Sequence, residues 1–241
     1  MKILKTISLA VITIVASTMS IFAFPIDWKN RIHSFFMRGW AKIFLKTGGV
    51  KIEVEGMRNL KAANPAVIMI NHESLIDIPV SVAALPVEQR FLAKIELYKI
   101  PIFGWCLYLG GHIPVNRRNP KEAIRKINLK SGTIVERGQN FVIAPEGTRS
   151  LAGRIGRFKK GGFKIAENYD LPIIPVTLLG NRYCAPKNSL YLKAGKVKVI
   201  VDQAVYLDDF EKIEVCMDYI RNRMIVRKDQ YELKRAGREY A

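Results

Sequence analysis

Residues 66–77 read AVIMINHESLID, an apolar run that stops abruptly at polar residues. The run over 66–70 is rich in aliphatic and β-branched side chains, which predicts a short buried strand. Polar residues that directly follow such a strand lie at its carboxyl end, where open α/β sheets bind their ligands. The segment therefore predicts a strand that delivers His72 to a cleft.

Similar apolar runs alternate with helical stretches along the rest of the chain. This alternation predicts an α/β domain with a partly parallel sheet. The sequence shows no internal repeat and no low-complexity linker, so we expect one catalytic domain over residues 48–241. Strands are predicted at residues 50–54, 66–70, 113–115, 141–144, 173–178, 190–192 and 197–201, helices from around residue 74 and over 120–136, and a charged amphipathic stretch from 208 onward.

His72 and Asp77 form the first candidate for catalysis. Residues five apart on one straight helix point about 140° away from each other, so the two cannot meet on such a helix. They can meet if His72 lies in the turn before the helix and Asp77 lies in its first turn, with Ser74 as the candidate N-cap. Asp77 can then hold one imidazole nitrogen while the other takes a proton from a hydroxyl. The alternative is that residues 74–77 only cap the helix and His72 is an ordinary loop histidine.

A second polar cluster, GGHIPVNRR, covers residues 110–118. Arg117 follows a short β-run, and Lys94 comes near it if the intervening segment loops back. Cations in this arrangement are suited to bind a phosphate. The alternative is a solvated basic loop, and His112 has no assigned role.

A third cluster, PEGTRS, covers residues 145–150 directly after an apolar run. Glu146, Thr148 and Arg149 offer an acceptor, a hydroxyl and a cation, and Gly147 permits close approach of the backbone. The alternative is a surface turn with a local ion pair between Glu146 and Arg149, which is worth little in stability.

The charge balance is strongly basic, with 39 Lys and Arg against 21 Asp and Glu and a net charge of +18. Such a charge suits nucleic acid, an anionic membrane surface or a phosphorylated substrate. The chain has no nucleic-acid-binding motif and no interleaved aromatic platform, so we expect no nucleic-acid partner. Three widely spaced cysteines and three histidines form no disulfide framework and no zinc pattern, so we expect a reducing compartment and no metal.

The N-terminal region predicts a pair of membrane-anchoring helices over residues 1–47. Residues 6–26 are uncharged, and as a helix they reach roughly the 30 Å of a bilayer core. Residues 31–46 then alternate apolar and basic side chains at helical spacing, as in interfacial helices. The alternatives are a cleaved signal peptide for the first segment and an ordinary helix packed on the domain for the second. The basic charge places residues from 29 onward in the cytoplasm, whether the first helix crosses the bilayer or dips into one leaflet.

Together, in this order and spacing, the clusters resemble the glycerolipid acyltransferase family typified by lysophosphatidic acid acyltransferases. Residues 72–77 look like its H-x-x-x-x-D motif, 111–117 like its second block, 145–150 like its E-G-T-R block, and 171–176, LPIIPV, like its apolar fourth block. The resemblance covers roughly residues 50 to 205. The second block departs from the family pattern, which often has an acid before the arginine, and this leaves the acceptor's identity open.

The resemblance implies a mostly parallel central sheet flanked by helices, and acyl transfer without a cofactor. The acyl group would pass from acyl-CoA or acyl carrier protein to the free hydroxyl of lysophosphatidic acid, giving phosphatidic acid. His72 would be the general base and Asp77 its orienter. The residues that would bind the acceptor and its phosphate are Lys94, Arg117, Glu146, Gly147, Thr148, Arg149 and Lys159.

The resemblance also bears on location and on rival functions. Bacterial members carry a two-helix N-terminal membrane module, which implies a bacterial inner-membrane protein with membrane lipids as partners and its catalytic domain on the cytoplasmic side. Another acceptor, such as glycerol phosphate, a lysophospholipid or a lyso-ornithine lipid, is the alternative within the class. A lipid hydrolase that uses His72 with a serine, for which Ser74 lies near in sequence, or with bound water is the alternative outside it, although no G-x-S-x-G elbow is present.

Overall fold

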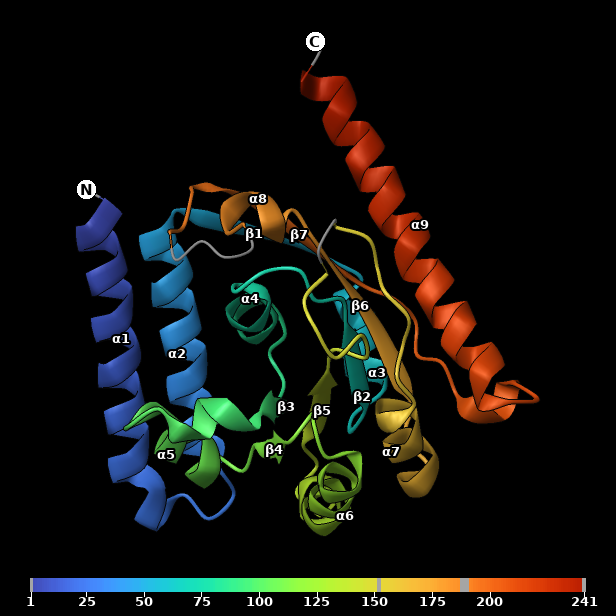
Figure 1. Ribbon diagram of the computed structural model, residues 1–241, viewed down its shortest axis with the longest axis horizontal. Coiled ribbons are helices and arrows are strands. Elements are labelled where there is room, and N and C mark those ends of the chain that lie inside the picture. Colours follow the sequence, from blue (N-terminus) through green and yellow to red (C-terminus); the bar gives the residue numbers. More distant parts are fainter. Residues whose placement is uncertain (1, 151–152, 187–190, 240–241) are drawn as a thin grey trace.

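The computed structural model describes residues 2–150, 153–186 and 191–239 (Figure 1). Its elements in chain order are α1 (Lys2–Ala23), η1 (Phe24–Ile26), α2 (Arg31–Gly48), β1 (Val50–Glu55), α3 (Met57–Ala62), β2 (Val67–Ile70), α4 (Asp77–Ala84), β3 (Gln89–Lys94), η2 (Ile95–Lys99), α5 (Phe103–Leu109), β4 (Ile113–Val115), α6 (Pro120–Glu136), β5 (Asn140–Ile143), α7 (Gly161–Tyr169), β6 (Ile173–Leu179), α8 (Asn181–Cys184), β7 (Gly195–Val201), η3 (Leu207–Asp209) and α9 (Ile213–Glu239).

The described strands form a seven-stranded sheet in the order β1-β7-β6-β2-β5-β3-β4. Neighbouring strands are parallel except β6 and β7, so the predicted mostly parallel sheet flanked by helices is confirmed. The central strand β2 pairs with β5 on one side and β6 on the other. Because parallel strands end at the same edge, the residues after β2, β5 and β6 meet there.

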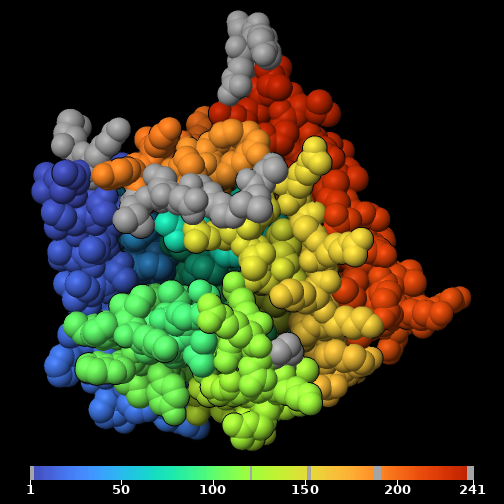
Figure 2. Space-filling view, in the orientation of Figure 1, coloured from blue at the N-terminus to red at the C-terminus, as the bar shows by residue number. Residues whose placement is uncertain are grey.

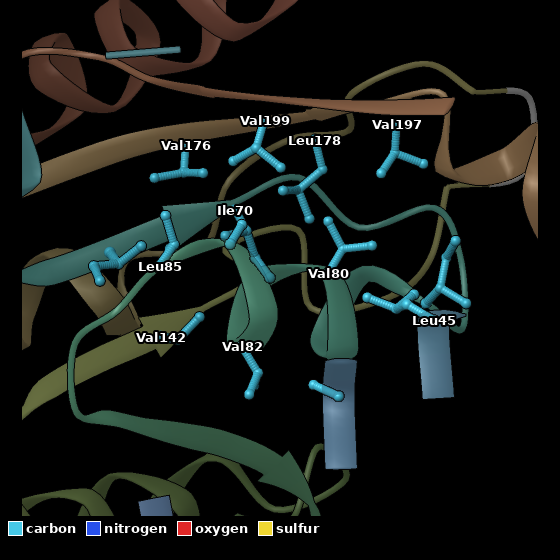
Figure 3. Close-up of a cluster of buried hydrophobic side chains, with 14 of the residues drawn as sticks. Leu45, Ile70, Val80, Val82, Leu85, Val142, Val176, Leu178, Val197 and Val199 are labelled. Atoms are coloured by element: carbon cyan, nitrogen blue, oxygen red, sulfur yellow. The ribbon is translucent and has the colours of Figure 1, made fainter. Parts of the chain in front are cut away.

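Each face of the sheet is covered by helices, which explains why its central strands are apolar throughout. Alternate side chains of β2 enter two different cores. Ile68 and Ile70 pack in a cluster with side chains of α2 and α4 (Figure 3). Val67 and Met69 join the opposite cluster, which includes side chains of α6, α7 and α9.

The N-terminal helices form an antiparallel hairpin beside the sheet (Figure 1). At one end the Lys5 ammonium donates to the Gly48 carbonyl over 2.8 Å, and at the other the Ser20 hydroxyl lies 2.7 Å from His33 Nδ1. The inner face of α2 is part of the core through Ala41 and Leu45. The second helix therefore packs on the domain, which is the alternative that the sequence left open.

The outer face of α1 is apolar and exposed. Among the described residues, one helical segment, Ile3–Ile26, is long and apolar enough to cross a membrane. The side chains of Val11, Val15 and Phe22 are exposed, and that of Phe22 is 80% exposed. A helix with one face packed on α2 and the other apolar and open is suited to contact lipid.

Three expectations differ from the structure. The strand β3 was not predicted, because its first residues are polar: Gln89 and Arg90 are fully buried and hydrogen-bonded to Ser81 and Ser34. The strand expected at 190–192 is absent from its described part, residues 191 and 192, and residue 190 lies outside the described residues. Leu192 instead lies in a segment without regular secondary structure, and its side chain is next to Gly48 at the end of α2.

The start of α4 is the third difference. The helix begins at Asp77 with Ile76 as its N-cap, and Ser74 is not the cap. The Ser74 hydroxyl donates to the Ala185 carbonyl over 2.8 Å instead. Residues 73–76 form a turn because the Asp77 carboxylate binds backbone N–H groups of that turn.

Candidate functional site

His72 lies directly after β2, in the turn that precedes α4. Its Nδ1 is 2.7 Å from Oδ2 of Asp77. The Asp77 side chain is fully buried, whereas that of His72 is 19% exposed. No side chain or backbone group of the described residues hydrogen-bonds His72 Nε2. The structure thus brings the pair together across the strand-to-helix turn and leaves one imidazole nitrogen open.

The Asp77 carboxylate organises this turn as well as the imidazole. Its Oδ2 also accepts the backbone N–H groups of Glu73 and Ser74, each over 2.8 Å. A carboxylate that receives several N–H donors is held in one orientation. Asp77 can therefore orient the imidazole and stabilise the imidazolium that forms when Nε2 takes a proton.

Asn181 is a site residue that the sequence analysis missed. It follows β6 and is fully buried, and its amide Nδ2 donates to Asp77 Oδ1 over 2.7 Å, across a sequence separation of 104 residues. The signal was present in the sequence, since a Gly-Asn pair ends the apolar run before it, as polar residues do at the other two clusters. Asp77 therefore has hydrogen bonds on both oxygens.

Glu146, after β5, connects two backbone segments of the site. Its Oε1 accepts the His72 N–H over 2.9 Å and its Oε2 accepts the Gly156 N–H over 2.8 Å. Burial raises the pKa of this carboxyl, while the two backbone N–H groups lower it. Both oxygens are thus engaged within the chain, so Glu146 holds the turn of His72 and Asp77 against the loop that follows β5.

Gly147 and Lys159 lie against each other. Gly147 has φ +74°, and a Cβ at this position would lie 2.9 Å from Cε and 3.0 Å from Nζ of Lys159. The Lys159 backbone N–H donates to the Pro145 carbonyl over 2.8 Å, which fixes the loop beneath the side chain. Glycine is therefore required here both for its backbone conformation and for the space that the ammonium occupies.

The guanidinium groups of Arg117 and Arg149 influence each other electrostatically at the carboxyl edge of the sheet. Partial burial and the neighbouring Arg149 lower the pKa of Arg117, while Glu96 raises it. Among the described residues, neither Arg117 nor Arg149 forms an ion pair. Unpaired arginines that repel each other are suited to share an anion such as a phosphate.

Lys94 reaches the same edge through the sheet register. It pairs with Val115, two residues before Arg117, in the parallel ladder of β3 and β4. Its ammonium lies 3.4 Å from the Glu96 carboxylate, and both side chains are half exposed. Lys94 therefore lies near Arg117, as predicted. Thr148 is exposed and makes no hydrogen bond to the described site residues.

A hollow opens on the face seen in Figure 2. It lies between the green segment that includes α5 and the yellow segment after β5, with teal atoms of the β2–α4 region at its floor. His112 does not belong to it, since this side chain is fully buried and contacts His33. No group of three or more His, Cys, Asp or Glu within the described ranges lies close enough to hold a metal ion.

Residues 51–179 match a family model described as Acyltransferase. The chain belongs to the Acyltransferase family. All three polar clusters of this family member lie within the matched region, and they meet at the carboxyl edge of its sheet.

Relatives of this family member are named for one reaction. A 1-acyl-sn-glycerol-3-phosphate acyltransferase from Cocos nucifera is 31% identical over 87% of this chain and 72% of its own length, and one from Pseudomonas aeruginosa is 29% identical over 79% and 75%. A chloroplastic enzyme of that name from Brassica napus is 31% identical over 82% of this chain. The match spans about half of two chloroplastic relatives, 56% and 50% of their length.

A solved structure shares the fold. The 1-acyl-sn-glycerophosphate (LPA) acyltransferase PlsC from Thermotoga maritima superposes with a TM-score of 0.79 over 98% of this chain and 96% of its own, at 24% identity. The likeness extends over the N-terminal hairpin as well as the sheet.

Proposed function

We propose that this family member transfers a fatty acyl group from an acyl thioester to the free hydroxyl of lysophosphatidic acid, giving phosphatidic acid. One observation carries the proposal. His72 is held by Asp77 through Nδ1 at 2.7 Å and keeps Nε2 open, at the sheet edge that carries the unpaired Arg117 and Arg149. A base beside an anion-binding pair suits a hydroxyl acceptor that bears a phosphate. The names of the relatives support the same reaction.

The chemistry follows from the orientation of the imidazole. Nδ1–H donates to Asp77, so Nε2 is the atom that accepts the hydroxyl proton. The acceptor oxygen then attacks the thioester carbonyl, the tetrahedral intermediate collapses, and the C–S bond breaks. The imidazolium returns its proton to the departing thiolate. A base in this position typically contributes about 10²- to 10⁴-fold to the rate.

The acceptor phosphate has a natural place among the cations at this edge. Arg117 and Arg149 would bind it directly, and Lys94 and Lys159 would add charge around it. Gly147 and Thr148 belong to the loop after β5 that carries Arg149 and would contact the acceptor. Acyl-CoA and acyl carrier protein are both acyl thioesters with anionic groups, so either is a donor that this basic edge can receive.

The exposed apolar face of α1 in the N-terminal hairpin supports attachment of the protein to a membrane. We propose a bacterial inner-membrane protein with its catalytic domain on the cytoplasmic side. Because α1 is tied to α2 at both ends and α2 is packed on the domain, α1 cannot move away from the domain to cross the bilayer alone. This geometry favours a helix that dips into one leaflet with its exposed apolar face.

The hydrolase alternative meets a structural obstacle. In the form that uses a serine, the nucleophile would be Ser74, but this hydroxyl is fully buried and donates to the Ala185 carbonyl. A hydroxyl engaged in this way is not available to attack a substrate carbonyl. The form that uses bound water is separated by the assay below, because it would release free fatty acid without acylating an acceptor. The other acceptors of the same class remain the alternative that the experiment must separate.

The test uses the full chain in detergent or lipid, with labelled acyl-CoA and acyl carrier protein as donors. The acceptors are lysophosphatidic acid, glycerol phosphate, lysophosphatidylethanolamine and a lyso-ornithine lipid. We expect labelled phosphatidic acid, lost in His72→Ala. Arg117→Gln should raise KM for lysophosphatidic acid about tenfold or more, whereas Arg58→Gln, an exposed arginine on α3, should not. Acylation of a different acceptor in preference, or activity retained in His72→Ala, would refute the proposal.

A further inference from the structure

A buried ion pair joins the catalytic turn to the C-terminal helix. The carboxylate of Glu73, the residue after His72, pairs with the ammonium of Lys228 on α9, across 155 residues of sequence. The two residues are 4% and 5% exposed. Charged groups are almost never buried to this degree unless they are paired.

Glu73 lies beside the catalytic carboxylate. Its backbone N–H donates to Asp77 Oδ2 over 2.8 Å. Burial raises the pKa of Glu73 most strongly, Lys228 lowers it, Asp77 raises it, and Arg182 lowers it. Glu73 Oε1 has no hydrogen-bond partner among the described residues. Two carboxylates therefore share a buried region, and Lys228 is the cation that contacts one of them.

The same helix reaches the site by a second route. Arg221 donates to the carbonyls of Ile155 and Gly156, over 3.0 and 2.8 Å. The Gly156 N–H in turn donates to Glu146, which accepts the His72 N–H. The helix α9 thus contacts the turn directly through Lys228 and, through Arg221, the loop that Glu146 joins to it. The helix also packs along β6 (Figure 1).

Stability alone does not account for the buried pair. A buried ion pair is often no better for stability than apolar residues of similar volume. Partly exposed pairs already attach α9 to the body, from Arg223 and Arg227 to Asp202 and from Arg182 to Glu232. What distinguishes the Glu73–Lys228 pair is its place next to Asp77.

We infer that Lys228 is a positioning residue for the His72–Asp77 pair, acting through Glu73. The inference rests on the proposed function for its role in catalysis. Lys228 balances the Glu73 charge, so that Asp77 alone sets the charge seen by the imidazole, and it fixes the turn whose N–H groups hold Asp77. Removal of either partner leaves one buried charge unbalanced beside the catalytic pair, whereas removal of both restores neutrality.

Steady-state kinetics test the positioning role. We expect Lys228→Met and Glu73→Gln each to lower kcat about 10- to 100-fold, with KM for the acceptor changed by less than about twofold. The double variant should have a kcat within about threefold of the wild type, because the two charges are coupled. The Lys228→Arg variant, which keeps the positive charge, should also have a kcat within about threefold of the wild type. Lys234→Met, at an exposed position on the same helix, is the matched control and should match the wild type.

A titration separates this inference from the proposed function, because it needs no substrate. The chain has three histidines, and burial lowers the pKa of His33 to about 3 and that of His112 well below its ordinary value. The His72 signal in an NMR titration is identified by its absence from His72→Gln. In Glu73→Gln the unbalanced Lys228 should move the midpoint of that signal down by about half a pH unit or more. The double variant should restore it.

The outcomes are distinct. A purely structural brace would lower the melting temperature of the single variants and leave the His72 titration unchanged, and that result overturns the inference. A double variant no better than the worse single variant also overturns it. If no acceptor in the panel is acylated, the proposed function fails, while the titration still decides whether Lys228 acts on His72.

Discussion

The buried pair of His33 and His112 predicts a loss of folding stability in acid. The Phe91 N–H donates to His112 Nδ1 over 3.0 Å, so His112 carries its proton on Nε2. That nitrogen is 3.1 Å from His33 Nε2, which must accept, and His33 Nδ1 therefore donates to the Ser20 hydroxyl at 2.7 Å. Each imidazole is neutral in this chain of hydrogen bonds. Protonation of either one places two donors face to face.

The magnitude follows from the shifted pKa values. Burial and the nearby Arg90 lower the pKa of His33 to about 3, although Asp27 raises it, and burial lowers that of His112 well below its ordinary value. A group with a depressed folded-state pKa contributes stability that is present above its unfolded pKa and is lost as pH falls toward the folded pKa. Each histidine therefore removes about 1.4 kcal/mol per pH unit below about pH 6.5.

The measurement compares the wild type with His33→Gln by urea unfolding in detergent at pH 7.5 and 5.5. The wild type should lose about 1.4 kcal/mol more over this interval than the variant, which lacks one of the two groups. Glu73 and Glu146, whose pKa values are raised, act in the opposite direction but are present in both proteins. Gly161→Ala, which changes no titratable group and places its Cβ where nothing lies within 4 Å, is the control and should lose as much as the wild type. Equal losses in the wild type and His33→Gln would refute the neutral, buried assignment.

Three further predictions concern the site. The Asp77→Asn variant should keep the wild-type fold, because the Asn181 amide can turn its oxygen toward the new NH₂. It should lower kcat about 10²- to 10⁴-fold in the acyl-transfer assay, because the imidazolium loses its counter-charge. A wild-type kcat would contradict this prediction. Asn181→Asp should lower kcat more than Asn181→Ala, since it sets a second carboxylate against Asp77 Oδ1, and the reverse order would contradict the contact. Gly147→Ala should displace the Lys159 ammonium and raise KM for the acceptor about tenfold, with Gly161→Ala, where a Cβ meets nothing within 4 Å, as the control.

The parts of this fold that sequence could predict are those with a local cause. The helix α6 has the bounds that were predicted, and its start has a local cause, since the Asn119 side chain accepts the Glu122 N–H and Pro120 opens the helix. The strand β4 was likewise predicted at its observed bounds. In the site, the spacing predicted that His72 and Asp77 could meet only across a turn, and the structure joins them there; the family resemblance, not the spacing, singled out the pair.

The parts that sequence could not predict depend on partners far along the chain. Asn181 reaches Asp77 because β6 lies beside β2, and Lys228 reaches Glu73 because α9 returns across the sheet. Lys228 continues the buried row of Cys216, Ile220 and Met224 at four-residue spacing on α9, but the sequence does not show which residue this row faces. The strand β3 was missed for a related reason, since its buried Arg90 is satisfied by residues of α2 and its N-terminal turn.

The junction between the N-terminal hairpin and the sheet is polar. Its hydrogen bonds fix the orientation of the hairpin relative to the sheet edge that carries the site. Arg90 is fully buried and donates to the Asn30 carbonyl over 3.0 Å, while the Asn30 side chain binds the Leu109 carbonyl and receives Arg137, each over 2.7 Å. An apolar contact would let the hairpin slide, but these hydrogen bonds are directional and costly to leave unmade in the interior. Arg90 belongs to β3, the strand that ends at Lys94 and pairs with the strand before Arg117. The exposed apolar face of α1 is therefore held at a fixed angle to Lys94 and Arg117. Under the proposed function, this angle sets the height above the bilayer at which the acceptor phosphate is bound.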